Sequence, residues 1–579
     1  MNSESEKQPK ADDVRDVSIS SDVEGSRFKA EDGEHKLVRQ LKNRHIAMIS
    51  IGGVIGTGLF LTTGNKFAPV RRTSWYFAFG LLLGYLAVGS ITYSVMISLG
   101  EMVAYLPIPG GHIKLAERFV DPAFSFTMGW NYWYNWTVVL PAELSAAAVL
   151  INYWNKSVNN AAWISIILVV VIGINMCGAG VYGEAEFIFA SIKVITITGL
   201  IILGIVLDLG GGPDHDRIGF RYWKNPGPFV QYNDIGGAKG RFLGWWAVMT
   251  QAAFSYIGTE IVAIAAGEAK NPRRNLPKAI KRVYIRILLF YIGGVIIVGL
   301  LVPSNDEHLN LSDGTAASSP FVIAIQRSGI KALPSIINAC LLTSAWSAGS
   351  SDLYTSSRAL YGLAAAGNAP RIFLKASPQR PPNSLSDLLL VLVSKSSLVS
   401  VQFRQLQPDG VLIPSSSALL AYMGISSGSN KVFQWFSAMT SVAGLMTWFG
   451  ICLTYLRFYA GMKAQGYDRK HLPFASPLQP YAAWYAMCFC IIICFFSGWA
   501  VFLKGNWDTA TFVTNYLPFI LFPILYGGAK FHYWRNGKGF LWTRPEDLDY
   551  VTDIAEIEAD CYDDPPPKNK IEAFWAWLM

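Results

Sequence analysis

The sequence predicts an all-α polytopic membrane protein with about twelve transmembrane helices, two of which are discontinuous. The chain of 579 residues is 52% hydrophobic and only 15% charged, and a soluble chain of this size would carry more charge. Apolar runs of about 20 residues, the length that crosses a bilayer, recur along it. The basic residues fall between these runs, so the net charge of +8 does not indicate nucleic-acid binding. We therefore expect the lipid bilayer, and no nucleic acid, as a partner.

Eleven apolar runs are candidate spans, and a twelfth is expected between Arg380 and Arg457, because the basic loops on both sides of this stretch favour the cytoplasm. The runs lie at 45–64, 76–98, 123–151, 161–178, 187–207, 242–267, 284–302, 332–353, 433–455, 481–503 and 511–528.

Loop charge predicts the orientation, because Lys and Arg in short loops stay on the cytoplasmic side. The loops after the sixth, eighth and tenth spans are basic, and Arg286 is counted with the first of them. Both chain termini are then cytoplasmic. We expect a disordered cytoplasmic N-terminal tail at 1–40, a transmembrane transporter domain at 41–530 and a cytoplasmic C-terminal tail at 531–579.

Two spans contain matching breaks. The first includes IGGVIGTGLF at 51–60, with four glycines, and glycine weakens a helix interior. The sixth includes AFSYIGTEI at 253–261, and the triplet Ile-Gly-Thr occurs in both stretches. Interrupted spans at corresponding places in two halves indicate a binding site near the membrane midplane between inverted repeats. Close helix packing through small residues is the alternative for the first stretch.

Longer motifs carry a resemblance to a known family. The chain resembles the fungal amino-acid permeases of the amino acid–polyamine–organocation superfamily in ordered strings that run from about residue 36 to the C-terminus. They include GGVIGTGLF, SLGEMVAYLPIPGG, RFVDPAF, PAELSAA, YGEAEF, FSYIGTE, EAKNPRRNLPKAI, SDLYTSSRALYGLA and SVAGLMTW. The resemblance implies a LeuT-like carrier with a 5+5 inverted repeat, which imports amino acids with protons across the plasma membrane.

The substrate of such a carrier needs two complementary partners. Its carboxylate suits exposed N–H groups at the start of a half-helix, and its ammonium suits carbonyls at the end of another. Side chains beside the second break are expected to line the pocket, although core packing is the alternative for Phe254 and Tyr256. The expected substrate-binding residues are Gly53, Ile55, Gly56, Thr57 and Gly58 in the first break and Ala253, Phe254, Ser255, Tyr256, Ile257 and Gly258 in the second.

Lys193 is the principal candidate for proton coupling. It stands inside an apolar run, where a charge is costly and therefore indicates function. The resemblance implies that a lysine of the fifth helix replaces a bound sodium ion between the first and eighth helices, and Lys193 matches that position. A lysine that snorkels to the membrane surface is the alternative. The other candidates are Glu260, Glu143, Ser350 and Ser351, and Ser347 and Asp352 complete a polar patch that should face Lys193.

Three further glutamates, Glu101, Glu184 and Glu186, lie near the ends of apolar runs, where solvated or structural roles are expected. The sequence shows no phosphate-binding loop, nucleophile elbow or metal-ligand spacing, so we expect no enzyme and no cofactor. A non-transporting amino-acid receptor of the same fold and a polyamine or organic-cation carrier stay open as alternatives. On the cytoplasmic tails we expect the ubiquitin and trafficking machinery as partners.

One stretch departs from the resemblance. The ninth span should begin at 381–417, but the apolar pieces there are shorter than a span: the one at 388–401 is broken by Lys395, and the one at 415–425 is preceded by Pro414. We predict that 381–417 is not native permease sequence and comes from a misread splice junction. The stretch 70–79, with basic residues on the outer side, is a smaller case of the same error.

Overall fold

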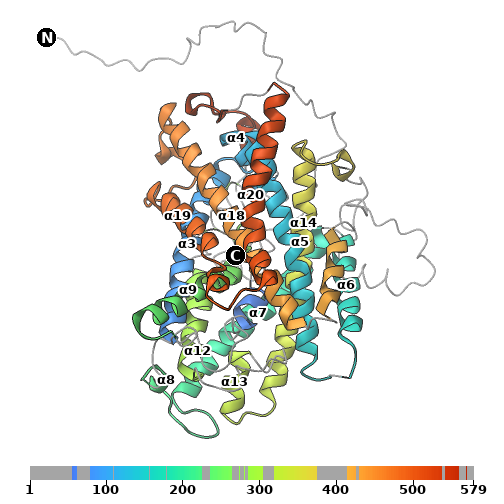
Figure 1. The fold of residues 1–579 in the computed structure, drawn as a ribbon, viewed down its shortest axis with the longest axis vertical. Coiled ribbons are helices and arrows are strands. Elements are labelled where there is room, and N and C mark those ends of the chain that lie inside the picture. The colour runs from blue at the N-terminus through green and yellow to red at the C-terminus, as the bar shows by residue number, and fades with distance from the viewer. Residues whose placement is uncertain are drawn as a thin grey trace, which may run out of the picture.

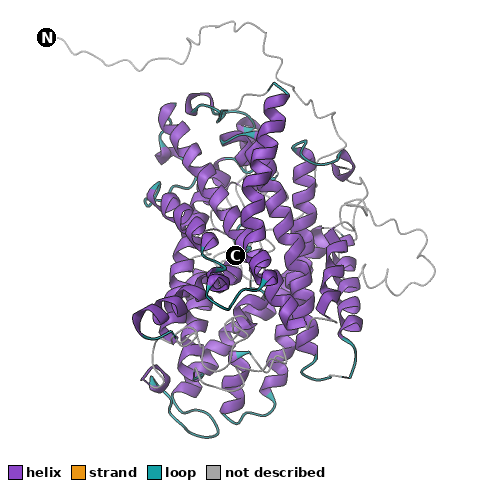
Figure 2. Cartoon of the chain, viewed as in Figure 1, coloured by secondary structure: helices purple, strands orange, loops and turns teal. Residues whose placement is uncertain are grey.

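The structure is a computed structural model that describes residues 48, 55–61, 78–108, 110–155, 157–177, 179–224, 235–261, 263, 273, 280, 285–303, 319–374, 414–424, 429–537, 541–559 and 569. The regular secondary structure of these residues is helical, without a strand among them (Figure 2). The predicted all-α class is confirmed to this extent. Most of 381–417 and of 70–79, and all of 1–40, lie outside the described residues.

The helices form one elongated bundle, in which helices far apart in the sequence lie side by side (Figure 1). The elements are α2 (Thr57–Leu61), α3 (Ala78–Tyr105), α4 (Gly111–Phe119), α5 (Pro122–Ile151), α6 (Asn160–Met176), α7 (Ala179–Asp208), α8 (Arg221–Lys224), α9 (Gly237–Tyr256), the π-helical turn η5 (Ile287–Ile292), α12 (Gly293–Leu301), α13 (Pro320–Arg327), α14 (Leu333–Ala365), η8 (Arg371–Leu374), η9 (Ala418–Met423), α18 (Ser429–Ala464), η10 (Arg469–His471), α19 (Tyr481–Phe495), η11 (Trp499–Phe502), α20 (Thr509–Arg535), η12 (Pro545–Asp547) and α21 (Ile554–Ala559).

Helix α5 lies at the centre of the bundle, where it packs along α14 and α18 (Figure 1). Its most apolar window is 89% buried, whereas the corresponding windows of α7 and α20 are 39% and 28% buried. The outer helices therefore expose apolar side chains, such as Ile195 at 71% and Val169 at 70%. Apolar residues on the outside of a bundle suit a lipid environment, and α3, α5, α7, α18 and α20 are each long and apolar enough to cross a bilayer.

Several helices are longer than the apolar runs that predicted them. Helix α7 begins at Ala179, eight residues before the expected start at 187, and α14 continues to Ala365 instead of ending near 353. An apolar run marks only the part of a helix that lies in lipid or core, whereas the backbone hydrogen bonds continue through polar residues. As a consequence Glu184 and Glu186 stand inside the first two turns of α7, near the N-terminal end of a candidate span that begins at Val181.

The two expected breaks differ in how much of them is described. Helix α9 ends at Tyr256, Ile257 is extended, and Gly258 has a φ of 99°, so the sixth span is interrupted as predicted. Residues 55 and 56 are not helical and α2 begins at Thr57. Gly53 and most of the preceding residues lie outside the described part of the chain. That the two breaks are related by an inverted repeat stays a prediction.

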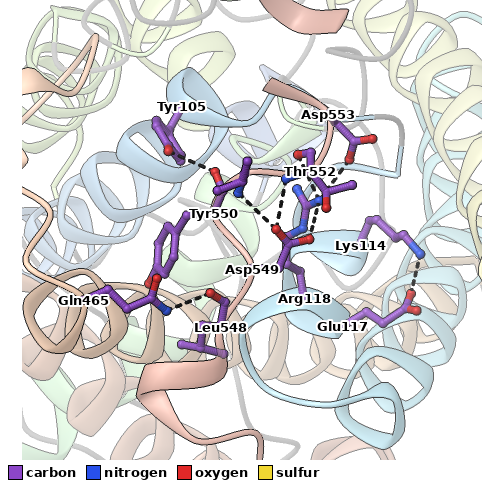
Figure 3. Close-up of polar contacts among 11 residues, drawn as sticks. Tyr105, Lys114, Glu117, Arg118, Gln465, Leu548, Asp549, Tyr550, Thr552 and Asp553 are labelled. Carbon is purple, nitrogen blue, oxygen red and sulfur yellow. Dashed lines mark hydrogen bonds and ion pairs between the residues drawn. The ribbon is translucent and has the colours of Figure 1, made fainter. Parts of the chain in front are cut away.

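The C-terminal segment, residues 541–559, lies against the ends of α3, α4 and α18 (Figure 3). Tyr550 is buried among aromatic rings of all three helices, and its hydroxyl donates to the Phe458 carbonyl at 2.5 Å. Gly461 makes room for it, because a Cβ there would lie 2.5 Å from the tyrosine oxygen. Arg118 pairs with Asp549 and Asp553 at 3.1 and 3.0 Å. The segment thus joins three helix ends.

Residues 414–417 form a helical turn that leads into η9. The Ser417 hydroxyl donates to the carbonyls of Thr137 and Pro414, at 2.8 and 2.7 Å, so the turn is attached to α5. The prediction that 381–417 is foreign to the fold is not tested by these few residues.

Candidate functional site

The two helix breaks lie against each other. A Cβ at Gly58 would come within 3.1 Å of Phe254 Cδ1 and of the Ser255 Cα. A side chain at this position would therefore crowd the end of α9, and glycine suits the close approach. The Ile55 carbonyl accepts a hydrogen bond from Ser344 of α14 at 3.1 Å, which fixes the non-helical backbone from the other side. Ile55 to Gly58 and Phe254 to Ser255, all expected in one site, are therefore brought together.

The end of α9 offers backbone carbonyls, because the last turn of a helix has no following N–H groups. The Ala253 carbonyl accepts from Ile257 N at 3.0 Å, after which the chain leaves the helix. Glu260 occupies the far side of this break. Its Oε2 accepts from Gly258 N at 3.2 Å and from Trp448 Nε1 of α18 at 3.1 Å. Glu260 thus stabilises the interrupted backbone.

The aromatic residues beside the break have different surroundings. Phe254 packs on Gly58 and edge-on against Phe433, with ring centroids 5.9 Å apart. Tyr256 is fully buried, stacks on Tyr291 at 4.4 Å and donates to the Tyr85 carbonyl at 3.1 Å. Tyr256 therefore packs in the core, which was the alternative to a place in the pocket. Phe254 lies at the break itself.

Glu143 connects the first break to a second group of polar residues. Its Oε1 accepts from Thr57 Oγ1 at 2.9 Å and would lie 3.1 Å from a Cβ at Gly56. Glu143 stands in the C-terminal half of α5, two residues after Pro141, and is only 4% exposed. The carboxyl group therefore touches the non-helical backbone that starts α2.

The second group surrounds Lys193, whose side chain is fully buried in the middle of α7. Snorkelling to the surface is therefore excluded. Its ammonium lies 3.8 Å from Glu186 Oε1, and Glu186 Oε2 accepts from Ser347 Oγ at 2.7 Å. Lys193 also interacts electrostatically with Glu143 and Asp352. Of the polar patch of α14, Ser347 and Asp352 therefore lie at this group. We call Lys193, Glu143, Glu186 and Asp352 the lysine cluster.

The two expected serines of α14 take separate positions. Ser351 accepts from Tyr182 of α7 at 3.1 Å, beside the lysine cluster. Asn175 of α6 donates through its Nδ2 to the carbonyl oxygen and to the hydroxyl oxygen of Ser350, both at 3.1 Å. Ser350 therefore holds α6 to α14. Glu260 likewise stands apart, with its described partners at the second break.

The sequence did not indicate the surroundings of two residues of these sites, Glu186 and Arg286. Glu186 was expected near a helix end, but it is the ion-pair partner of Lys193. Its spacing of seven residues from Lys193, two helical turns, was a usable signal. Arg286 was counted with a cytoplasmic loop, but it is only 1% exposed and interacts electrostatically with Tyr256, Tyr291 and Glu260. Its position next to an apolar run gave no indication of which way it points.

Comparisons with known proteins show the family of this chain. The family model described as amino acid permease matches residues 45–541. A proline-specific permease of Emericella nidulans is 38% identical over 550 residues, which are 93% of this chain and 93% of that protein. The lysine-specific permease of Saccharomyces cerevisiae is 38% identical over 97% of this chain and 86% of its own length. The dicarboxylic amino acid permease of the same yeast is 40% identical over 89% of this chain and 81% of its own length. The chain therefore belongs to the amino acid permease family, as a multi-pass membrane protein and not an enzyme.

Proposed function

We propose that the protein imports amino acids across the plasma membrane by proton symport, with alternating access to its site from the two sides. The observation that carries this proposal is the contact between the two helix breaks at Gly58 and Ser255. An amino acid presents a carboxylate and an ammonium close together, and the start of one helix and the end of another offer complementary backbone groups at that contact.

The substrate carboxylate is assigned to the backbone of Gly56, Thr57 and Gly58, and the ammonium to the carbonyls at the end of α9. Phe254 stands where the substrate side chain would extend, because it packs on Gly58. The relatives described above are named for proline, lysine and dicarboxylic amino acids at 38 to 40% identity. Overall similarity therefore does not select a substrate, and residues around Phe254 are the place where selection is expected.

Coupling is assigned to the hydrogen bond between Thr57 and Glu143. It joins the proposed carboxylate site to the lysine cluster, in which protons can be gained and lost. A substrate that changes the backbone at Thr57 changes the surroundings of Glu143 and, through it, of Lys193. By linkage, a change of proton occupancy at the cluster then changes substrate affinity.

The remaining expectations belong to the same proposal: twelve spans with a 5+5 LeuT-like repeat, cytoplasmic termini, and the ubiquitin and trafficking machinery on the tails. We also retain the proposal that 381–417 and 70–79 are not native sequence. Sequencing the transcript across both stretches tests it, and a message that encodes them as written, in a protein with family-like transport rates, would contradict it.

The decisive experiment is uptake in a yeast strain that lacks its own permeases. Labelled L-proline, L-lysine and L-glutamate are offered at two external pH values, with and without a protonophore. Accumulation of at least one of them, stronger at the lower pH and lost with the protonophore, is the expected result.

Purified protein in lipid vesicles separates the alternatives. A receptor would bind an amino acid without moving it into the vesicles, and an organic-cation carrier would prefer a polyamine such as spermidine over all amino acids tested. Either result would overturn the proposed function.

A further inference from the structure

The lysine cluster contains more acid than base. Glu143 of α5, Glu186 of α7 and Asp352 of α14 surround Lys193, and all four residues are at most 4% exposed. Each carboxyl group interacts electrostatically with the ammonium. Among the described residues these are the charged groups that act on Asp352. The neutral groups beside them are Ser347 and Ser351 of α14 and Tyr182 of α7.

The three carboxyl groups are not equally paired. Glu186 has Lys193 at 3.8 Å and Ser347 at 2.7 Å. Glu143 has Thr57 on one oxygen, while the other oxygen has no hydrogen-bond partner within the described structure. Asp352 Oδ2, also buried, has no hydrogen-bond partner there either. Asp352 is therefore the member of the cluster that is neither tied to the ammonium by an ion pair nor tied to the first break.

A charge count shows what this arrangement requires. Three ionised carboxylates and one ammonium would leave two negative charges without compensation inside the bundle. A buried charge without a partner costs several kcal/mol on common estimates, so such groups are neutralised by a proton. With the Lys193–Glu186 pair ionised, neutrality requires a proton on each of the other two carboxyl groups.

We propose that Asp352 is a second proton-binding residue of the carrier, loaded and unloaded during transport in addition to the proton site at Lys193. This inference rests on the proposed proton symport. In the arrangement described here Asp352 carries its proton. When α14 is exposed to water on the side of low proton concentration, the O–H bond breaks and the proton leaves to water. The Asp352 carboxylate is then solvated by the water that reaches α14, and it shares the ammonium of Lys193 with Glu186.

The test is the pH dependence of KM for the amino acid that gives the largest uptake. For each proton that must bind with the substrate, KM rises by up to about tenfold per pH unit above the titration of its site. Asp352→Asn keeps the shape of the protonated carboxyl but cannot lose the proton. The slope of log KM against pH is expected to fall by about one unit in this variant, whereas exchange of labelled for unlabelled substrate at equal pH persists.

Two further variants control for structural damage. Asp352→Glu keeps an ionisable group and should keep the steep slope. Thr355→Val changes a buried residue one turn further along α14 that has no described hydrogen-bond partner and no charge. It should leave the slope unchanged. An unchanged slope in Asp352→Asn, in a protein that transports normally, would overturn the role of Asp352 and leave proton symport standing.

If uptake by the wild-type protein does not change with pH or with a protonophore, proton symport itself is overturned, and the role of Asp352 with it. If Asp352→Asn does not fold, infrared difference spectra between high and low pH decide the question with wild type and Asp352→Glu. A protonated-carboxyl band that shifts in the Glu variant supports the proposal, and a band that does not shift contradicts it.

Discussion

Charged residues at the end of α3 and in the middle of the bundle have opposite surroundings, although both groups are buried. Glu101 is fully buried and accepts from Tyr455 at 2.6 Å, from Ser476 N at 2.7 Å and from Arg469 at 2.7 and 3.3 Å. Asp352, which is also buried, has an oxygen without a hydrogen bond in the described structure. One carboxyl group is held by donors on both oxygens, and the other is not.

The difference separates charges that hold helices together from charges that change state. Buried polar groups in proteins are almost always hydrogen-bonded, and an exception calls for an explanation such as strain, function or a bound water. Glu101 joins α3 to α18 and to the segment around Ser476, which explains its burial completely. The lysine cluster has no such explanation, because a fixed structure would be more stable with its carboxyl groups satisfied. Four substitutions can break or sharpen this comparison.

The largest effect is expected at Lys193. Lys193→Met removes the ammonium and leaves Glu186 without its ion-pair partner, and breaking a buried pair in this way costs about 3–5 kcal/mol. Accumulation against a gradient should be lost. The double variant Lys193→Met/Glu186→Gln should recover thermal stability in detergent but not accumulation, because the charge is removed with its partner. Concentrative uptake by Lys193→Met equal to wild type would show that the lysine is structural.

The next effect is expected at Gly56. Gly56→Val places a branched side chain against Glu143 Oε1, which lies 3.1 Å from the Cβ position, and blocks close approach of a ligand to the backbone. Affinity should fall by a similar factor for every transported amino acid, because all share the carboxylate. Competition assays with several amino acids measure this. Gly173→Ala is the control, because a Cβ there meets nothing within 4 Å. Loss of a single substrate would argue against the assignment.

A smaller effect is expected at Glu101. Glu101→Gln keeps the shape but removes the charge that Arg469 and Tyr455 donate to, and hydrogen bonds to charged groups contribute about 1.5–3 kcal/mol. The melting temperature should fall. The dependence of KM on pH should stay as in wild type, since this carboxylate is already satisfied. A flattened pH profile in Glu101→Gln would remove the distinction between the two regions.

The smallest effect is expected at Asp549. Burial opposes its ionisation, but hydrogen bonds from the N–H groups of Thr552 and Val551 and the charge of Arg118 lower the pKa of Asp549. A carboxyl group whose pKa is lowered by folding stabilises the folded state at every pH above its ordinary pKa of about 3.9. This stability is lost only as the pH falls through the lowered pKa.

Docking of the C-terminal segment should therefore not change between about pH 5 and pH 8. Asp549→Asn should weaken it by only about 0.2–1 kcal/mol, as for other partly exposed ion pairs. Protease protection of residues 541–559 measures the docking, with Tyr550→Ala as the strong reference because that ring is buried. A strong pH dependence in this range would contradict the assignment.

The sequence by itself determined the features that are local. Hydropathy indicated the membrane class, glycines indicated the breaks at Gly56 and Gly258, and an isolated lysine in an apolar run indicated Lys193. Each of these follows from residues within one or two helical turns. Helix ends were less well predicted, as for α7, because a helix continues beyond the part that is apolar.

Only the tertiary structure decided which charges meet. Thr57 and Glu143 are 86 positions apart, and Ser347 reaches Glu186 across 161 positions. The same packing buries Arg286, and it directs the ring of Tyr256 toward Tyr291 in the core. The physical reason is that the direction of a side chain depends on the rotation of its helix against several neighbours at once. No stretch of sequence contains that rotation, because it is set by contacts between helices that are far apart along the chain.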